Sequence, residues 1–307
     1  MIDTFALRII SSKEPDLKLL RNNNFVTEYH KYTGKPRKYF YNMSNNEPTI
    51  DIYLTKDAVW IVKVLATPAN WIKGSNLYLP LDSEIPDILD LLSYFVTGKT
   101  GYDFDAHTAI VTRVDFTKDY YVGTQNIHPI ISNFRSASSN KYEVKPYKET
   151  TVYFNNKSKV RDKTIKIYSK EHKVETKTND VLDKFAAKGL IRLEVMLKNA
   201  KVRYLIDKFK LSDRQAKTIL NNELSNRFLD SVKKEIEFED RMKYQKPKLE
   251  RIFEGKTVPR ALTLLGYRYA QKSLGQEFYK KPSLKITPKT IKSYEKDCTE
   301  SGLFSLE

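Results

Sequence analysis

Three segments of this chain alternate polar and apolar side chains, and this alternation restricts them to strands of a sheet with one polar face. The segments are VTRVDFT at residues 111–117, TIKIYSK at residues 164–170 and LIRLEVML at residues 190–197. Successive side chains of a strand point to opposite faces, so each segment buries its aliphatic residues and presents its polar ones together. If the three strands are neighbours, the shared face carries a tyrosine, two carboxylates and several cations. These residues are Arg113, Asp115, Lys166, Tyr168, Lys170, Arg192 and Glu194.

Other segments complete a mixed architecture. Clusters of β-branched and aromatic residues predict further strands at residues 2–10, 49–54, 59–65 and 151–154. Apolar stripes with capping residues and terminal glycines predict helices at residues 82–98, 124–136 and 179–189. Because the strands alternate in polarity and are not uniformly apolar, the pattern favours an α+β fold over a doubly wound parallel sheet. We expect a central antiparallel sheet backed by helices, with a small helical C-terminal region.

The C-terminal part differs in composition from the rest. After residue 198 the pattern becomes helical, and residues 241–259 are basic and interrupted by proline, as in a linker. We therefore expect a larger domain over residues 1–240 and a basic helical region over residues 241–307. Short basic helices in this region fit duplex DNA recognition, and they fit equally well a helical extension that packs on the main domain.

The charge of the chain indicates an acidic polymer as its partner. The formal net charge is +16 and the sequence pI is about 9.5. Lys and Arg gain affinity for nucleic acid by releasing counterions from phosphates. No apolar run approaches the roughly 20 residues of a membrane-spanning helix, and the first residues lack a basic leader with a cleavage site. We expect a cytoplasmic protein with no membrane partner, and the single cysteine, Cys298, excludes an internal disulfide framework.

Two interpretations of Tyr168 remain open from the residues alone. A phenol with an ordinary pKa of about 10 attacks a phosphodiester poorly, so a nucleophilic tyrosine needs nearby cations or a metal. Lysines and arginines of the same face supply cations, and Asp115 and Glu194 supply ligands for a hard divalent ion. In the second interpretation, the tyrosine packs across strands and the carboxylates form ion pairs with Arg113 and Arg192.

The order of several motifs resembles that of a known family. The motifs are MIDTFALRI, KVLATPANWIKGSN, VTRVDFT, ETTVYFNNKSKVRDKTIKIYSKEHKVE and KGLIRLEVMLKNAKVRYL, in this order. Together they cover most of residues 1–210. The chain is similar to phage and plasmid rolling-circle replication initiators of the filamentous-phage gene II type, and more distantly to staphylococcal-type plasmid initiators.

The resemblance implies an enzyme that nicks one strand of a DNA origin and rejoins it. Such an enzyme stays attached to the 5′ phosphate through tyrosine and leaves a 3′ hydroxyl as a primer. Tyr168 and Lys170 match the catalytic YxK element, while Asp115 and Glu194 match the carboxylates that hold Mg²⁺ or Mn²⁺. Arg113, Lys166 and Arg192 are expected to bind DNA. The expected partner is an origin duplex with an exposed single-stranded nick site, with a host helicase as a further candidate.

Two questions stay open beside this resemblance. Related nickases hold their metal with a pair of histidines around an apolar residue, and this chain has no such pair. A third metal ligand is therefore unassigned, with Glu171 and Glu175 as candidates. The alternative function is a protein that binds nucleic acid without cutting it, in which Tyr153 and Tyr168 stack on bases.

Overall fold

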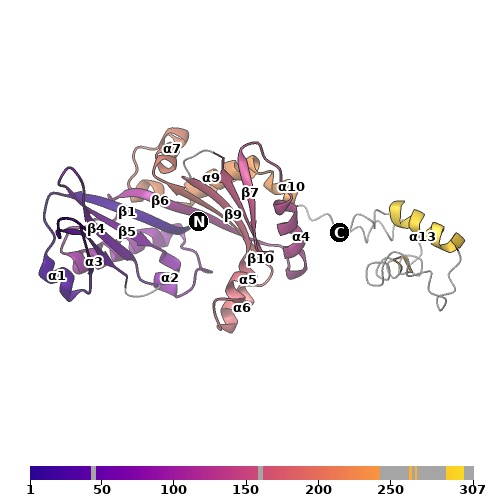
Figure 1. The fold of residues 1–307 in the computed structure, drawn as a ribbon, viewed down its shortest axis with the longest axis horizontal. Helices are drawn as coiled ribbons and strands as arrows, with labels where there is room; N and C mark the ends of the chain where they lie inside the picture. Colours follow the sequence, from indigo (N-terminus) through magenta and orange to yellow (C-terminus); the bar gives the residue numbers. More distant parts are fainter. Residues whose placement is uncertain (43–45, 158–161, 243–262, 265–266, 268–287, 301–307) are drawn as a thin grey trace. The chain divides into compact units, whose positions relative to one another are not determined.

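A ten-stranded sheet organises the larger part of the molecule, in the order β2-β3-β4-β5-β1-β6-β10-β9-β8-β7, with every neighbouring pair antiparallel. The structure is a computed structural model that describes residues 1–42, 46–157, 162–242, 263–264, 267 and 288–300 (Figure 1). The strands are β1 (Ile2–Ser11), β2 (Val26–Tyr29), β3 (Pro36–Tyr41), β4 (Thr49–Leu54), β5 (Trp60–Ala66), β6 (Ile110–Tyr121), β7 (Tyr142–Tyr147), β8 (Thr151–Asn156), β9 (Lys163–Ser169) and β10 (Leu190–Lys198).

Helices follow most of the strands. They are α1 (Leu17–Asn22), α2 (Pro68–Lys73), η1 (Asp82–Glu84), α3 (Ile85–Thr100), α4 (Thr124–Arg135), α5 (Lys170–Glu175), α6 (Val181–Ala187), α7 (Ala200–Phe209), α8 (Ala216–Ile219), α9 (Asn222–Glu235), α10 (Phe238–Met242) and α13 (Pro288–Glu300). The α+β class and the antiparallel sheet predicted from the sequence are confirmed.

The hydrophobic core lies between one face of the sheet and the helices that pack on it, among them α3, α4 and α9. The aliphatic residues of the alternating segments are almost fully buried on this face, including Val114, Leu193 and Ile165. Aromatic pairs join the helices to it, with ring centroids 5.7 Å apart for Phe116 and Phe228 of α9. Phe134 of α4 packs edge-on against Phe154, and Phe95 of α3 packs edge-on against Tyr41. Burial of these large side chains supplies the main driving force for folding.

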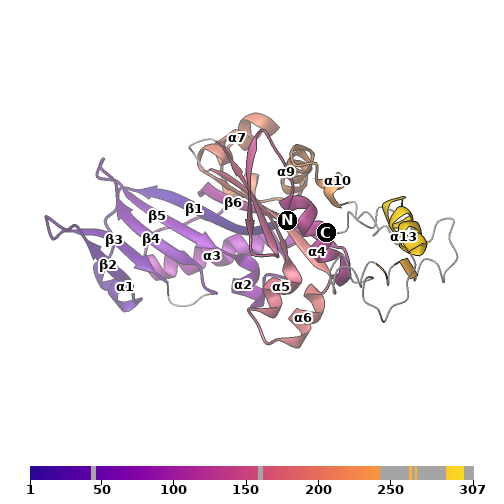
Figure 2. The same cartoon turned by 45° about the vertical axis from the view of Figure 1, so that its right-hand side comes forward.

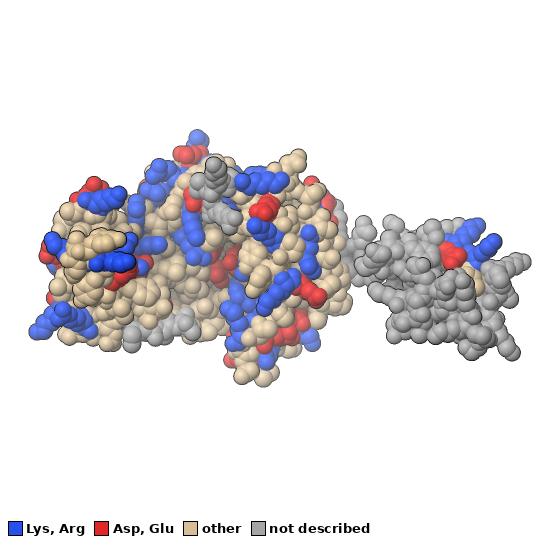
Figure 3. All heavy atoms as spheres, viewed as in Figure 1, with Lys and Arg blue, Asp and Glu red and all other residues tan. Residues whose placement is uncertain are grey.

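The opposite face of the sheet carries the polar residues. Lys and Arg side chains are spread over the part of Met1–Met242 seen in Figure 3, with Asp and Glu among them. Figure 2 shows β2, β3, β4, β5 and β1 side by side, with α1, α2 and α3 close to them. Helices α5 and α6 project from the sheet beyond the end of β9 in both ribbon views. The polar face therefore has helices at one end and an extended sheet surface beyond it.

Some element boundaries differ from the sequence predictions. The helix predicted to stop at Gly98 continues to Thr100, because Gly101 adopts the left-handed conformation (φ 71°) that ends it. Lys170 belongs to a helix and not to the preceding strand, since the Ser169 hydroxyl accepts a hydrogen bond from the backbone N–H of His172 and caps α5. Strands β2, β3 and β7 and helices α1 and α2 were not predicted.

The chain divides into two compact units, Met1–Met242 and Lys243–Glu307. In the second unit the structure describes α13 and a few further residues, including a ring contact between Tyr267 and Tyr294 at 5.2 Å. The linker expected at residues 241–259 lies almost entirely outside the described residues, and so do most of the helical residues expected just after it. Within the described part of the chain, no helix is both long and apolar enough to cross a membrane.

Candidate active site on the polar face of the sheet

Strands β6, β10 and β9 lie side by side, so the three alternating segments share one face as predicted. Tyr168 on β9 lies directly opposite Arg192 on β10, and Lys166 lies opposite Glu194. On the other side of β10, Asp115 of β6 lies opposite Met196, two residues from Glu194. The pairing places the tyrosine and both carboxylates on a single three-strand surface.

The hydroxyl of Tyr168 lies between a carboxylate and an ammonium group. It donates a hydrogen bond to Glu194 Oε2 at 3.2 Å and accepts one from Lys173 Nζ at 3.2 Å. The ammonium groups of Lys166 and Lys173 lie 4.3 Å and 4.7 Å from the centre of its ring. The side chain is only 2% exposed. Burial, and next the negative charge of Glu194, raise the pKa of the phenol well above 10, so the phenol is protonated in this arrangement.

Lys173, and not Lys170, is the lysine beside the phenol. Because α5 begins at residue 170, the side-chain period changes from two to 3.6 residues, and Lys173 returns to the tyrosine one turn later. Lys170 is fully buried and donates to Asn76, at 2.5 Å to Oδ1 and 3.2 Å to the backbone oxygen. Burial, and next the charges of Arg192 and Lys173, lower the pKa of Lys170 to about 7. Lys170 thus donates to Asn76 and not to the phenol, and its role in the YxK element stays a prediction.

Arg192 is buried and pairs with carboxylates of two other strands. Its side chain is 0% exposed, and its Nε and Nη2 donate to the carboxylate of Asp119 at 2.5 Å and 2.6 Å. Nη1 donates to Asp3 Oδ1 at 3.3 Å. Asp119 lies directly opposite Arg192 on β6, which explains the bidentate geometry. In this structure the guanidinium of Arg192 has no exposed surface and is paired with two carboxylates, so its contact with DNA stays a prediction.

Three carboxylates lie near one another on this face. Asp115 is 2% exposed and accepts two hydrogen bonds from Arg113, at 2.8 Å from Nε and 2.5 Å from Nη2. Burial raises the pKa of Asp115 to about 6; the pairing with Arg113 opposes this shift, and the charges of Glu194 and Asp3 add to it. The pKa of Asp3 is raised as well, by burial and next by Glu194. Asp3 is thus a member of the site that sequence analysis missed.

The position of Asp3 depends on an irregularity in β1. The pairing of β1 with β6 shifts register between Ile2 and Thr4, so strict alternation fails at this residue. An aspartate among the apolar residues at the start of a strand is the one signal that the sequence offers.

The present arrangement does not fit a divalent cation. Among the described residues, no group of three or more His, Cys, Asp or Glu is placed to hold a metal ion. Arg113 occupies both oxygens of Asp115, and Glu194 accepts the phenol hydrogen bond. Glu171, a candidate third ligand, accepts hydrogen bonds from Gly189 N and Thr124 Oγ1 and so joins α5 to other elements. Glu175, the other candidate, is exposed at the end of α5.

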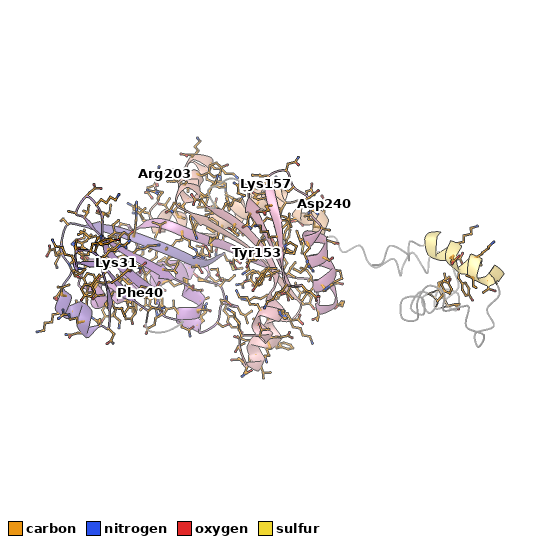
Figure 4. The ribbon with its side chains drawn as sticks, in the orientation of Figure 1. Lys31, Phe40, Tyr153, Lys157, Arg203 and Asp240 are labelled. Atoms are coloured by element: carbon orange, nitrogen blue, oxygen red, sulfur yellow. The ribbon has the colours of Figure 1, made fainter. Side chains whose placement is uncertain are left out.

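The remaining predicted DNA contacts have accessible surface. Arg113 is 29% exposed beside Asp115, and Lys166 is half-buried over the rings of Tyr168 and Tyr153. Tyr153 is labelled in Figure 4 and lies on β8 opposite Lys166. A second tyrosine, Tyr147, packs edge-on against it with ring centroids 6.2 Å apart. Cations and aromatic rings thus extend the face from β9 towards β7.

Fold and site together define an α+β protein whose polar sheet face carries a tyrosine in contact with an acid and an ammonium group. Residues 1–249 match the family model of the N-terminal region of the phage replication-associated protein of gene II, and the chain belongs to this family. The expected resemblance to gene II type initiators is confirmed, and the chain is a replication-associated protein. A comparison with curated proteins finds no match.

Proposed function

We propose that this protein is a replication initiator endonuclease that nicks one strand of its DNA origin with Tyr168. The observation that carries the proposal is the phenol held between Glu194 and Lys173 on a cationic sheet face. A tyrosine nucleophile needs a group that accepts its proton and a positive charge that stabilises the phenolate, and these two neighbours provide both. Membership of a replication-associated family supports DNA as the substrate.

In the proposed reaction, the oxygen of Tyr168 bonds to the phosphorus as the bond from phosphorus to the 3′ oxygen breaks. The phenol proton passes to Glu194, which already accepts its hydrogen bond. The leaving oxygen takes a proton from solvent and becomes the 3′ hydroxyl that primes synthesis. Lys173 offsets the negative charge that develops on the phenol oxygen. Attack of a 3′ hydroxyl on the phosphotyrosine reverses these steps and joins the strand.

The proposal requires that DNA uncover the phenol. The atoms over the ring include the ammonium groups of two long, flexible side chains, Lys166 and Lys173. A phosphate attracts both groups more strongly than an aromatic ring does, because the phosphate carries a full charge. We therefore infer that an incoming phosphate draws these lysines from the ring and takes their place beside the hydroxyl.

A divalent metal ion would act on the phosphate through its charge. Mg²⁺ or Mn²⁺ at Asp115 and Glu194 would supply charge stabilisation to the phosphate. Asp115 must first leave Arg113, which holds both of its oxygens. Measuring adduct formation with and without Mn²⁺, in wild-type protein and in Arg113→Gln, tests whether release of Asp115 lowers the Mn²⁺ concentration required.

The test of the nucleophile is a covalent adduct. Purified protein is incubated with supercoiled DNA of its own replicon and Mn²⁺, and the products are separated under denaturing conditions. Mass spectrometry of the protein–DNA adduct should identify residue 168. Tyr153→Phe, which changes the neighbouring tyrosine on β8, serves as the matched control and should keep the adduct. An adduct that persists in Tyr168→Phe contradicts the assignment.

A non-cutting nucleic-acid-binding protein is the second candidate function. The paired rings of Tyr147 and Tyr153 beside Lys166 favour it, because base stacking and cations are sufficient for binding single strands. Under this alternative, binding is unaffected by divalent ions and no adduct forms under any condition. Loss of adduct with retained binding in Glu194→Gln supports the enzyme instead.

A further inference from the structure

A hollow in the sheet surface lies away from the tyrosine, between β5 and β10. Its volume is about 220 Å³, and its lining includes Ala6, Lys63, Arg113, Lys198 and Thr49. Leu65, Ala6, Arg113 and Lys198 form one row across four adjacent strands, since each is paired with the next in register. The small side chain of Ala6 leaves the depression in this row, with longer side chains on both sides.

Like charges face each other directly at the rim of the hollow. Lys63 lies opposite Arg8 on β1, and Lys198 lies opposite Arg113 on β6. Two cations in directly opposed positions repel each other, so such pairs destabilise a sheet unless an anion lies between them. Because Asp115 already binds Arg113, the cations left for an anionic ligand at this hollow are the two lysines, Lys63 and Lys198.

Asp51 of β4 lies directly opposite Lys63, but neither Asp51 nor Asp115 forms an ion pair with Lys63 or Lys198. Asp51 also lines the hollow, but its carboxylate lies 2.7 Å from Lys38 Nζ. Asp115 is bound by Arg113. In the part of the chain that the structure describes, Lys63 and Lys198 have no side-chain hydrogen bond or ion pair. Both are half-buried at the hollow and available to a ligand.

We propose that this hollow binds a backbone phosphate of single-stranded DNA, several nucleotides away from the phosphate that Tyr168 attacks. Tyr168 lies opposite Arg192 on β10. Lys198 lies six residues further along the same strand, so it is about 20 Å from Arg192 at the rise of an extended strand. One strand of DNA crossing the polar face therefore reaches both places. The position relative to Tyr168 rests on the proposed function, whereas phosphate binding by the hollow does not.

The experiment measures binding of full-length protein in the Tyr168→Phe background without divalent ions, so cleavage plays no part. Affinity for a labelled oligothymidylate is followed by fluorescence anisotropy over a range of salt concentrations. The double variant Lys63→Gln/Lys198→Gln should bind more weakly. Its slope of log affinity against log salt should be shallower by roughly 0.7, because the hollow neutralises one phosphate of a single strand and each such phosphate contributes about 0.7.

A second double variant provides the matched control. Lys18→Gln on α1 and Lys217→Gln on α8 remove the same charge from exposed positions outside the hollow, and the slope should stay within error of the parent. DNA should also protect Lys63 and Lys198, but not Lys18 and Lys217, from chemical acetylation. Equal loss of slope in both double variants, or full reactivity of Lys63 and Lys198 in the bound protein, overturns the proposal. Failure to form a tyrosine adduct would leave this binding result unchanged, so the two proposals fail separately.

Discussion

In the proposed reaction, the lysine beside the phenol stabilises the charge that develops on the phenol oxygen. Lys173 and Lys170 lie one turn apart on α5, yet only Lys173 donates to the hydroxyl of Tyr168. Both lysines have a lowered pKa, with burial as the main cause. Because their partners differ, Lys173 is placed to stabilise the phenolate, whereas Lys170 anchors α5 to Asn76.

Lys173→Gln should reduce the rate of adduct formation by roughly 10²-fold, the size of a positioned acid or base contribution. The remaining activity should rise at higher pH, because the phenolate then forms without the help of a neighbouring cation. Initial rates between pH 7 and 9.5 test this, with exposed Lys177→Gln as the control. A Lys173→Gln profile parallel to that of the wild type would assign Lys173 a purely structural role.

Replacing Asp3 tests whether the pKa of Asp115 controls the nicking rate at low pH. Burial is the main cause that raises the pKa of Asp115 to about 6, and the negative charge of Asp3 adds to the shift. Removing that charge lowers the pKa of Asp115. In Asp3→Asn the acid limb of the nicking rate should therefore move to lower pH, measured from pH 5 to 8. Asp57→Asn, in the exposed turn after β4, should leave the limb in place, and an unmoved limb in Asp3→Asn would show that Asp115 does not control it.

At the scale of elements, a polar cluster joins α9 to β7 and β9 at the edge of the sheet. Glu235 accepts hydrogen bonds from Lys141 and Lys163, at 2.9 Å and 2.8 Å, and from Tyr142. Burial alone would raise the pKa of Glu235, but these three donors outweigh burial and lower the pKa to about 2. The cluster therefore stabilises the fold only while Glu235 is ionised.

Glu235→Gln should lower the free energy of unfolding by about 2–3 kcal/mol at pH 7. This is somewhat below the roughly 3–5 kcal/mol of a fully buried pair, because Glu235 is 25% exposed while its partner Lys163 is 8% exposed. In the wild type this stabilisation is complete above the unfolded pKa of about 4.5 and is lost as the pH falls towards 2. Urea unfolding at several pH values should show that acid-dependent loss in the wild type and a flatter curve in the variant. Glu223→Gln, on the same helix but exposed, should change stability by less than about 0.5 kcal/mol.

Element-scale features also explain what could be predicted from the sequence. Alternation in residues 111–117, 164–168 and 190–197 predicted the three site strands, because burial of one face fixes which side chains share the other. Strand β2 escaped prediction because most of it is exposed and its residues show no alternation. The helix that carries Lys173 depends on a cap formed by Ser169, which the strand pattern concealed.

The remaining members of the site come from contacts that no local pattern contains. Arg192 is buried because Asp119 and Asp3 lie on two other segments of the chain, up to 189 residues away. The pairing of Arg113 with Asp115 is local, and the sequence already offered it as an ion pair. Residue types and strand faces could thus be predicted, whereas the partner of each charge depends on the order and register of the strands.

At the scale of the whole molecule, the sheet and its cationic face belong to Met1–Met242, while Lys243–Glu307 forms a separate unit. In this second unit Lys and Arg outnumber Asp and Glu.

We predict that a chain truncated after Met242 folds and forms the adduct on a single-stranded oligonucleotide at a rate within about threefold of the full chain, because the core and every proposed site residue are retained. Duplex affinity should fall, and its salt dependence should become shallower, since phosphate contacts are lost with the basic segment. Circular dichroism, adduct formation and duplex binding at several salt concentrations test the three parts. Unchanged duplex affinity would assign DNA binding to the sheet unit alone, and the second unit would then have a role other than holding the duplex.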